Sequence, residues 1–82
     1  MFKKYTKAEK AQRALNLFQG EQDLEVLVAF DYKVVQFSEY HFRINNRLDV
    51  WPTSKKWWDT KTMRKGEYDN LVKFVKEFLP AM

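Results

Sequence analysis

The chain of 82 residues contains no cysteine, one histidine, two glycines and two prolines. The absence of cysteine excludes disulfides, thiolate-ligated zinc, iron–sulfur clusters and thiol chemistry. The single histidine, His41, would need carboxylate partners from elsewhere in the chain to hold a metal. We interpret it as a strand residue rather than as a ligand or a general base. The sequence therefore offers little catalytic chemistry, and we favour a protein that is not an enzyme.

Other familiar signals are also missing. No stretch approaches the roughly 20 apolar residues that span a bilayer, and residues 1–5 lack the apolar run that a signal peptide has behind its basic residues. The phosphate-binding patterns G-x-x-x-x-G-K and G-x-G-x-x-G do not occur, so no cofactor is expected. We expect a single cytoplasmic domain over 1–82 that contacts no membrane.

The chain does contain many aromatic residues and an uneven distribution of charge. Hydrophobic residues make up 45% and aromatic residues 17%, which is enough to build a folded core. The net charge is +4, with five basic side chains against one acidic in each of the segments 1–19 and 55–65, and four acidic side chains alone in 20–31. Basic clusters attract polyanions and accelerate their encounter, although they also serve solubility.

The N-terminal part is predicted to form a helix and then a strand. The segment Thr6-Lys7-Ala8-Glu9 is a capping box and Gly20 is a natural stop, which together predict a helix over about 7–19. The segment 24–30 is apolar at nearly every position, as in a central strand with both faces covered. The helix positions expected to face the sheet are Ala8, Ala11, Leu15 and Phe18.

A strand is predicted over 33–44, bent near Ser38, and another over 48–51. Parity selects a three-residue loop over 45–47 between them, because that loop keeps the apolar side chains on one face. The pairs that this register predicts are Ile44 with Leu48 and Phe42 with Val50.

The rest of the chain is predicted as a turn over 52–55, a strand over 56–60, a basic loop over 60–66 and a helix over about 67–79. Glu67 and Asp69 would lie in the first turn of that helix, where its dipole favours them. The predicted fold class is α+β. It is an antiparallel three- to four-stranded meander flanked by an N-terminal and a C-terminal helix, in the order α-β-β-β-β-α.

Three tryptophans bracket the turn 52–55. In the predicted register the tryptophan that ends the strand 48–51 points away from the core, and one of the adjacent pair after the turn does the same. The side chains expected on this second face are Trp51, Trp57 or Trp58, Arg43 and His41. Such a face is typical of a platform on which bases stack. Alternatively, the N-terminal helix covers the face and buries its tryptophans as core.

Asp49, Asp59 and Lys61 form the spacing D-x9-D-x-K. This resembles metal-dependent nucleases, in which two carboxylates on adjacent strands hold Mg²⁺ and a lysine orients the attacking water. The pattern is short, and a four-residue turn would place the two carboxylates on opposite faces of the sheet, whereas a five-residue turn would unite them.

The segment from Phe42 to Thr53 has the pattern F-R-I-x-x-x-L-D-x-W-P-T. Over about 37–79 the chain resembles small uncharacterised proteins of tailed bacteriophages, which implies expression inside an infected bacterium. The order of elements also resembles a double-stranded-RNA-binding domain, where a basic patch opens the second helix near the position of Arg64 and Lys65 here. The small-residue run of such second helices is absent, so this second likeness concerns the fold alone.

Three functional hypotheses follow. The first is binding of DNA or RNA, with basic clusters for phosphates and tryptophans for stacking. The second is a phage protein that binds and inhibits a host protein, such as a polymerase or a defence nuclease, through the same tryptophan-proline hairpin or through the acidic segment as a mimic of nucleic acid. The third is the small Mg-dependent nuclease. The candidate binding residues are Lys3, Lys4, Lys7, Lys10, Arg43, Trp51, Lys55, Lys56, Trp57, Trp58, Arg64 and Lys65.

Overall fold

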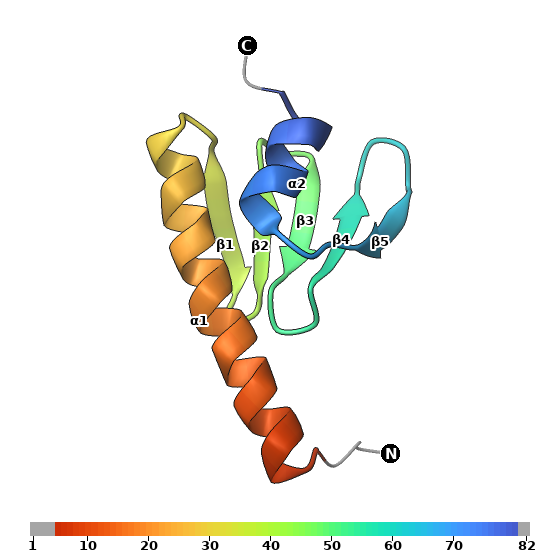
Figure 1. The fold of residues 1–82 in the computed structure, drawn as a ribbon. Coiled ribbons are helices and arrows are strands. Elements are labelled where there is room, and N and C mark those ends of the chain that lie inside the picture. Colours follow the sequence, from red (N-terminus) through yellow and green to blue (C-terminus); the bar gives the residue numbers. More distant parts are fainter. Residues whose placement is uncertain (1–4, 81–82) are drawn as a thin grey trace.

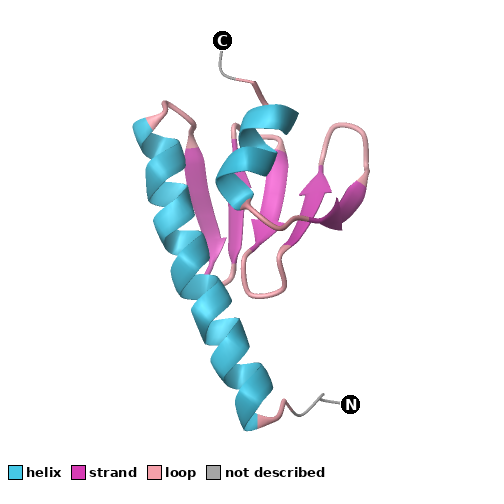
Figure 2. Ribbon diagram, in the orientation of Figure 1, coloured by secondary structure: helices cyan, strands magenta, loops and turns pink. Residues whose placement is uncertain are grey.

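The computed structural model describes residues 5–80. Its elements in chain order are α1 (Lys7–Ala29), β1 (Val34–Ser38), β2 (His41–Ile44), β3 (Leu48–Trp51), β4 (Lys56–Asp59), β5 (Lys65–Glu67) and α2 (Leu71–Phe78). The strands form one antiparallel sheet in the order of the sequence, as Figure 1 shows. The predicted α+β meander between two helices is confirmed, with β5 as an additional strand (Figure 2).

The first helix is much longer than predicted, and the strand over 24–30 is wrong. α1 continues through Gly20 to Ala29. Gly20 does not end the helix but lets it approach the turn after β3, because an added Cβ would lie 2.3 Å from the Cβ of Pro52. The apolar run that resembled a strand is divided between two sides of the helix, with Leu24 and Leu27 buried and Val26 exposed. The predicted capping box is confirmed at Thr6 and Glu9.

The helix also turns a different side to the sheet than predicted. Ala8, Ala11, Leu15 and Phe18 are all exposed. The side that meets the rest of the molecule instead carries Arg13, Asn16, Gly20, Leu24 and Leu27. Both sides have helical spacing, so periodicity alone did not identify the buried one.

The predicted strand over 33–44 is two strands, because the chain reverses completely at residues 39–40 instead of bending. β1 and β2 pair with a register shift between Gln36 and Ser38. The three-residue loop over 45–47 is confirmed, with Asn45 and Asn46 at positive φ. The predicted pairs of Phe42 with Val50 and Ile44 with Leu48 are found in the structure.

The C-terminal helix begins later than predicted. Residues 65–67 pair with β4 as β5 instead of remaining in a loop or starting the helix. Asn70 then caps α2, with its Oδ1 accepting a hydrogen bond from the backbone N–H of Lys73. Glu67 and Asp69 therefore lie before α2. The prediction that they lie in its first turn is wrong.

Both helices pack on one face of the sheet. Leu24 and Leu27 from α1 meet Leu71 and Val75 from α2 over the sheet. The sheet supplies Phe42, Ile44, Leu48 and Val50 to this core. Within residues 5–80, no helix is both long and apolar enough to cross a membrane.

Candidate functional site

The face of the sheet opposite the helices carries the most conspicuous group of side chains. Strand alternation places on it the side chains that lie between the core positions of β2, β3, β4 and β5. We call this surface the open face, and its members are His41, Arg43, Asp49, Trp51, Lys56, Trp58, Lys65 and Glu67. Its cross-strand pairs are Arg43 with Asp49, Asp49 with Trp58, Trp58 with Lys65, Trp51 with Lys56, and Lys56 with Glu67.

The structure decides between the two predictions for the tryptophans. Trp51 and Trp58 lie on the open face, where both are partly exposed. Trp57 lies on the core face, where its ring is 5.2 Å from the rings of Phe74 and Phe78. The N-terminal helix packs over the core face and leaves the open face uncovered.

One end of the open face is an aromatic stack. The rings of His41 and Trp51 lie 4.5 Å apart and almost parallel, at 14°. Phe37 lies 5.2 Å from His41 and covers the guanidinium of Arg43, whose Cζ is 4.6 Å from the ring centre. Trp51 is thus held in place from one side, as expected for a rigid stacking surface.

The middle of the open face is fixed by a buried aspartate. Arg43 donates two hydrogen bonds to Asp49, from Nε at 2.6 Å and from Nη2 at 3.1 Å. The Nε2 atom of His41 lies 3.1 Å from the second carboxylate oxygen. Burial raises the pKa of Asp49, but the Arg43 hydrogen bonds and the nearby His41 ring outweigh it and leave this pKa below its usual value. Arg43, which belongs to the predicted binding residues, is therefore paired with Asp49 within the molecule.

Towards β5 the open face becomes hollow. A depression of about 630 Å³ is lined by Trp51, Ser54, Lys56, Trp57, Trp58, Lys65, Gly66 and Glu67. On the core face behind this hollow, the pair Trp57 and Gly66 is tightly packed, because a Cβ added at Gly66 would lie 2.9 Å from two atoms of the Trp57 indole. Lys56 and Lys65 are exposed at its sides, so cations border an aromatic hollow.

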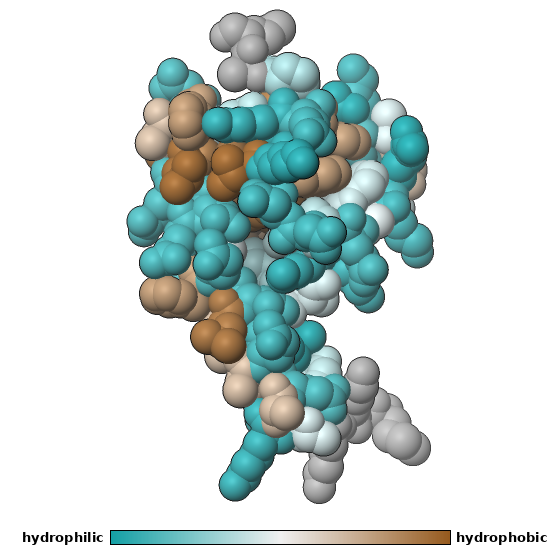
Figure 3. Space-filling model, in the orientation of Figure 1, coloured by the Kyte–Doolittle hydropathy of each residue, from teal (hydrophilic) through white to brown (hydrophobic). Residues whose placement is uncertain are grey.

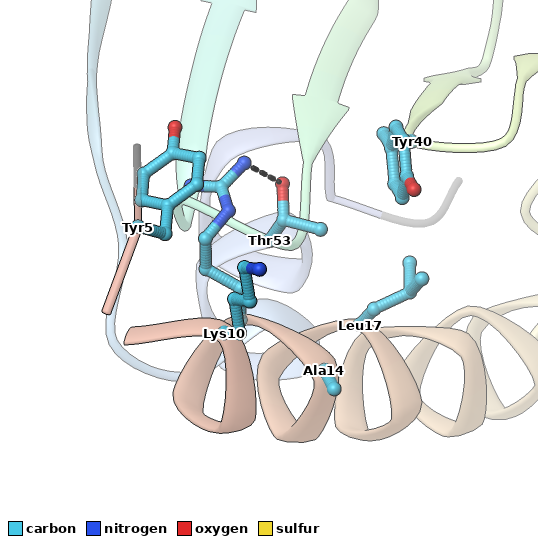
Figure 4. Close-up of a pocket in the computed structure, with 7 residues that line it drawn as sticks. Tyr5, Lys10, Ala14, Leu17, Tyr40 and Thr53 are labelled. Carbon is cyan, nitrogen blue, oxygen red and sulfur yellow. Dashed lines mark hydrogen bonds between the residues drawn. The ribbon is translucent and has the colours of Figure 1, made fainter. Parts of the chain in front are cut away.

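A second hollow lies where the exposed N-terminal part of α1 meets two turns. The Arg13 side chain donates a hydrogen bond to the Thr53 hydroxyl at 3.2 Å, and the Asn16 amide donates one to the Thr53 carbonyl at 3.1 Å. The pocket of about 370 Å³ beside them is lined by Tyr5, Lys10, Arg13, Ala14, Leu17, Tyr40 and Thr53 (Figure 4). The sequence did not suggest Tyr40 or Thr53 here, because the chain reversal at Tyr40 was not predicted.

The remaining predicted basic residues are dispersed. Lys7 and Lys10 are exposed on the first turns of α1. Lys55 is in the turn between β3 and β4, which contacts α1 through the hydrogen bond between Arg13 and Thr53. Arg64 lies in the loop between β4 and β5. This loop follows the end of β4, whereas the turn with Lys55 precedes its start, so the two residues lie at opposite ends of the strand. Lys3 and Lys4 lie outside the described residues.

The structure does not bring the residues of the D-x9-D-x-K spacing together. Asp49 is on the open face and Asp59 on the core face, as the four-residue turn required. Asp59 is fully buried and accepts two hydrogen bonds from Arg47, at 2.9 and 3.0 Å, and further ones from Thr62 and from the backbone of Lys61. In the part of the chain that is described, no three His, Asp or Glu side chains are placed to share a metal ion.

No protein-family model, curated protein or solved structure matches this chain.

Proposed function

We propose that the protein binds single-stranded nucleic acid on the open face. The observation that carries this proposal is the pair Trp51 and Trp58, partly exposed on a sheet face that neither helix covers, with Lys56 and Lys65 beside them. Aromatic rings on an open sheet stack unpaired bases, and neighbouring lysines attract the phosphates.

The spacing of the two tryptophans supports a single strand over a duplex. Asp49 pairs with Trp58 and Trp51 with Lys56, so the tryptophans are diagonal neighbours on adjacent strands. Such neighbours lie roughly 7–8 Å apart. At this distance each ring can stack on a different base, and the two bases are held apart instead of stacked on each other. A duplex hides its base faces, whereas an unpaired strand can present them one at a time.

Electrostatics on the open face leaves two lysines for phosphates. The Arg43 guanidinium is bound to Asp49 and holds the platform rigid. Lys56 on β4 and Lys65 on β5 both line the hollow, and both are exposed. Lys55 precedes Lys56 in the sequence and ends the turn whose Thr53 lines the same pocket as Lys10. The resemblance to small tailed-phage proteins supports an accessory role of this kind inside an infected bacterium.

The proposal is tested by fluorescence polarisation with labelled single-stranded DNA and RNA and with duplexes, at about 50 and 200 mM salt. We expect single strands to bind more tightly than duplexes, and binding to weaken steeply with salt. Trp58→Ala removes one stacking surface, worth about 1–3 kcal/mol, and should reduce affinity roughly 5- to 150-fold.

Charge reversal supplies the matched control. Lys65→Glu should weaken binding and reduce its salt dependence, whereas Lys73→Glu, at another exposed lysine, on α2, should change little. Equal effects of the two substitutions would show that net charge alone attracts the oligonucleotide. Absence of binding at low salt would contradict the proposal, and the remaining hypothesis would be a host protein as the partner of the same surface.

A further inference from the structure

The side of α1 that faces away from the sheet is unexpectedly apolar. We call it the outward stripe, and its members are Ala8, Ala11, Leu15, Phe18, Gln22 and Val26, all of them exposed. Leu15 is 62% exposed, Phe18 63% and Val26 42%. Figure 3 shows apolar patches along α1 among hydrophilic side chains. Large apolar side chains aligned on one helix side are typical of an interaction surface.

The outward stripe has the spacing of a helix-pairing seam. From Ala8 to Gln22 its positions alternate by three and four residues, which is the repeat that keeps one helix in contact with another. On the sheet-facing side, Gly20 and Leu27 are spaced by seven residues. The helix therefore has two apolar sides, of which the fold uses one.

Charge along α1 indicates what the outward stripe pairs with. The first half of the helix carries Lys7, Lys10 and Arg13 against one acidic residue, whereas its second half carries Glu21, Asp23 and Glu25 without a basic residue. No basic side chain lies in the last turn of α1. This polarity opposes the helix dipole, which favours acidic side chains at the N-terminus and basic ones at the C-terminus.

A second copy of α1 in the antiparallel orientation would remove this conflict. The basic half of each helix would then lie beside the acidic half of the other, and the two helix dipoles would oppose each other. A parallel copy would instead place like charges together. We therefore propose that the protein forms an antiparallel homodimer through the outward stripe of α1, with Leu15 and Phe18 as its central anchors.

The proposed dimer leaves the open face available. The outward stripe points away from the sheet, and the open face is on the far side of that sheet. The two surfaces thus share no residue. The dimer does not rest on nucleic-acid binding, and either proposal can fail without the other.

Sedimentation equilibrium over a range of concentrations tests the dimer. We expect wild-type protein to be dimeric at high concentration and Phe18→Glu to raise the dissociation constant at least about thirtyfold, as for a central aromatic anchor. The matched control is Met63→Glu, which adds the same charge at a side chain of similar exposure, 64%, in the loop after β4. It should leave the dissociation constant unchanged. Circular dichroism confirms that each variant is folded.

Charge complementation tests whether opposite charges drive the pairing of the two helices. Lys7→Glu with Lys10→Glu makes both halves acidic, and Glu21→Lys with Glu25→Lys makes both basic. Each double variant should be monomeric alone, and an equimolar mixture should form a heterodimer. A mixture that stays monomeric would overturn the role of charge in the proposal.

A cysteine tests the orientation, because the natural chain has none. α1 has 23 residues, so the N-termini of the two helices in an antiparallel pair lie about 33 Å apart. Lys7→Cys should therefore not form a disulfide within the dimer under mild oxidation. Rapid covalent dimerisation would overturn the antiparallel arrangement. A wild-type monomer at all concentrations, or an unchanged dissociation constant in Phe18→Glu, would overturn the dimer itself.

Discussion

Two aspartates show how individual charges are held in this small fold. Asp49 on the open face and Asp59 on the core face are both buried, and each accepts two hydrogen bonds from one arginine. Paired hydrogen bonds between guanidinium and carboxylate fix geometry as well as charge. The arginines, Arg43 and Arg47, therefore act within the molecule, and the surrounding lysines are the cations available to a ligand.

Asp59 makes stability depend on pH. Hydrogen bonds from Arg47, opposed by burial and assisted by Thr62 and the backbone of Lys61, hold the pKa of Asp59 well below its usual value. A carboxylate with a depressed folded pKa stabilises above its unfolded pKa of about 3.9, and this contribution is lost as pH falls further. The free energy of unfolding should therefore decrease as pH falls below about 5.

Urea denaturation at several pH values checks this prediction. Asp59→Asn should lower stability at pH 7 and flatten the dependence on pH. Asp69→Asn, at an exposed aspartate, is the matched control and should do neither. Equal pH profiles for wild type and Asp59→Asn would show that this pair does not control acid sensitivity.

Gly20 gives a second prediction at the residue scale. Replacing a helical glycine by alanine usually stabilises a protein, by up to about 1 kcal/mol. Here the added Cβ would lie 2.3 Å from Pro52, so the helix or the turn must shift. We expect Gly20→Ala to destabilise by about 1–3 kcal/mol, and Gln22→Ala, at an exposed site of the same helix, to change stability by less than about 0.5 kcal/mol. A stabilised Gly20→Ala in thermal unfolding would contradict this contact.

At the scale of elements, α1 is defined by its two apolar sides. One side holds Leu24 and Leu27 against the core, and the other exposes Leu15 and Phe18. The sequence shows an amphipathic pattern, but the strict alternation of three- and four-residue spacings, over residues 8–22, belongs to the exposed side of the helix and not to the buried one. Only the contacts with the turn after β3 and with α2 identify the buried side.

Two leucines in α1 provide a matched test of these sides. Leu27 is fully buried, and Leu27→Ala should cost about 2–5 kcal/mol of unfolding free energy. Leu15 is 62% exposed, so Leu15→Ala should change the stability of the dilute monomer by less than about 0.5 kcal/mol. Chemical denaturation at low protein concentration measures both, and comparable losses would show that α1 is rotated about its axis.

At the scale of the whole molecule, the sequence predicted the order of the meander and the register around the loop 45–47. Parity explains this success, because one slipped residue would have exposed Ile44 and Leu48. The same parity predicted Trp51 on the second face. It did not predict that α1 would continue beyond Gly20, because a run that is apolar at nearly every position fits a buried strand as well as a helix with two apolar sides.

The two proposed surfaces should act independently in the whole molecule. Trp58→Ala should weaken oligonucleotide binding and leave the sedimentation of the free protein unchanged, since Trp58 and the outward stripe are on different sides. Phe18→Glu should loosen the dimer and leave one oligonucleotide site per chain. Titration calorimetry gives the stoichiometry, and a site that disappears with the dimer would show that two copies build it together.

The outermost strands of the sheet have a consequence for how chains can meet. β5 is only three residues long and presents Lys65 and Glu67, and β1 has an irregular register between Gln36 and Ser38. Short, charged or irregular edges are poor templates for adding another strand. Growth of the sheet from chain to chain is therefore disfavoured at both edges.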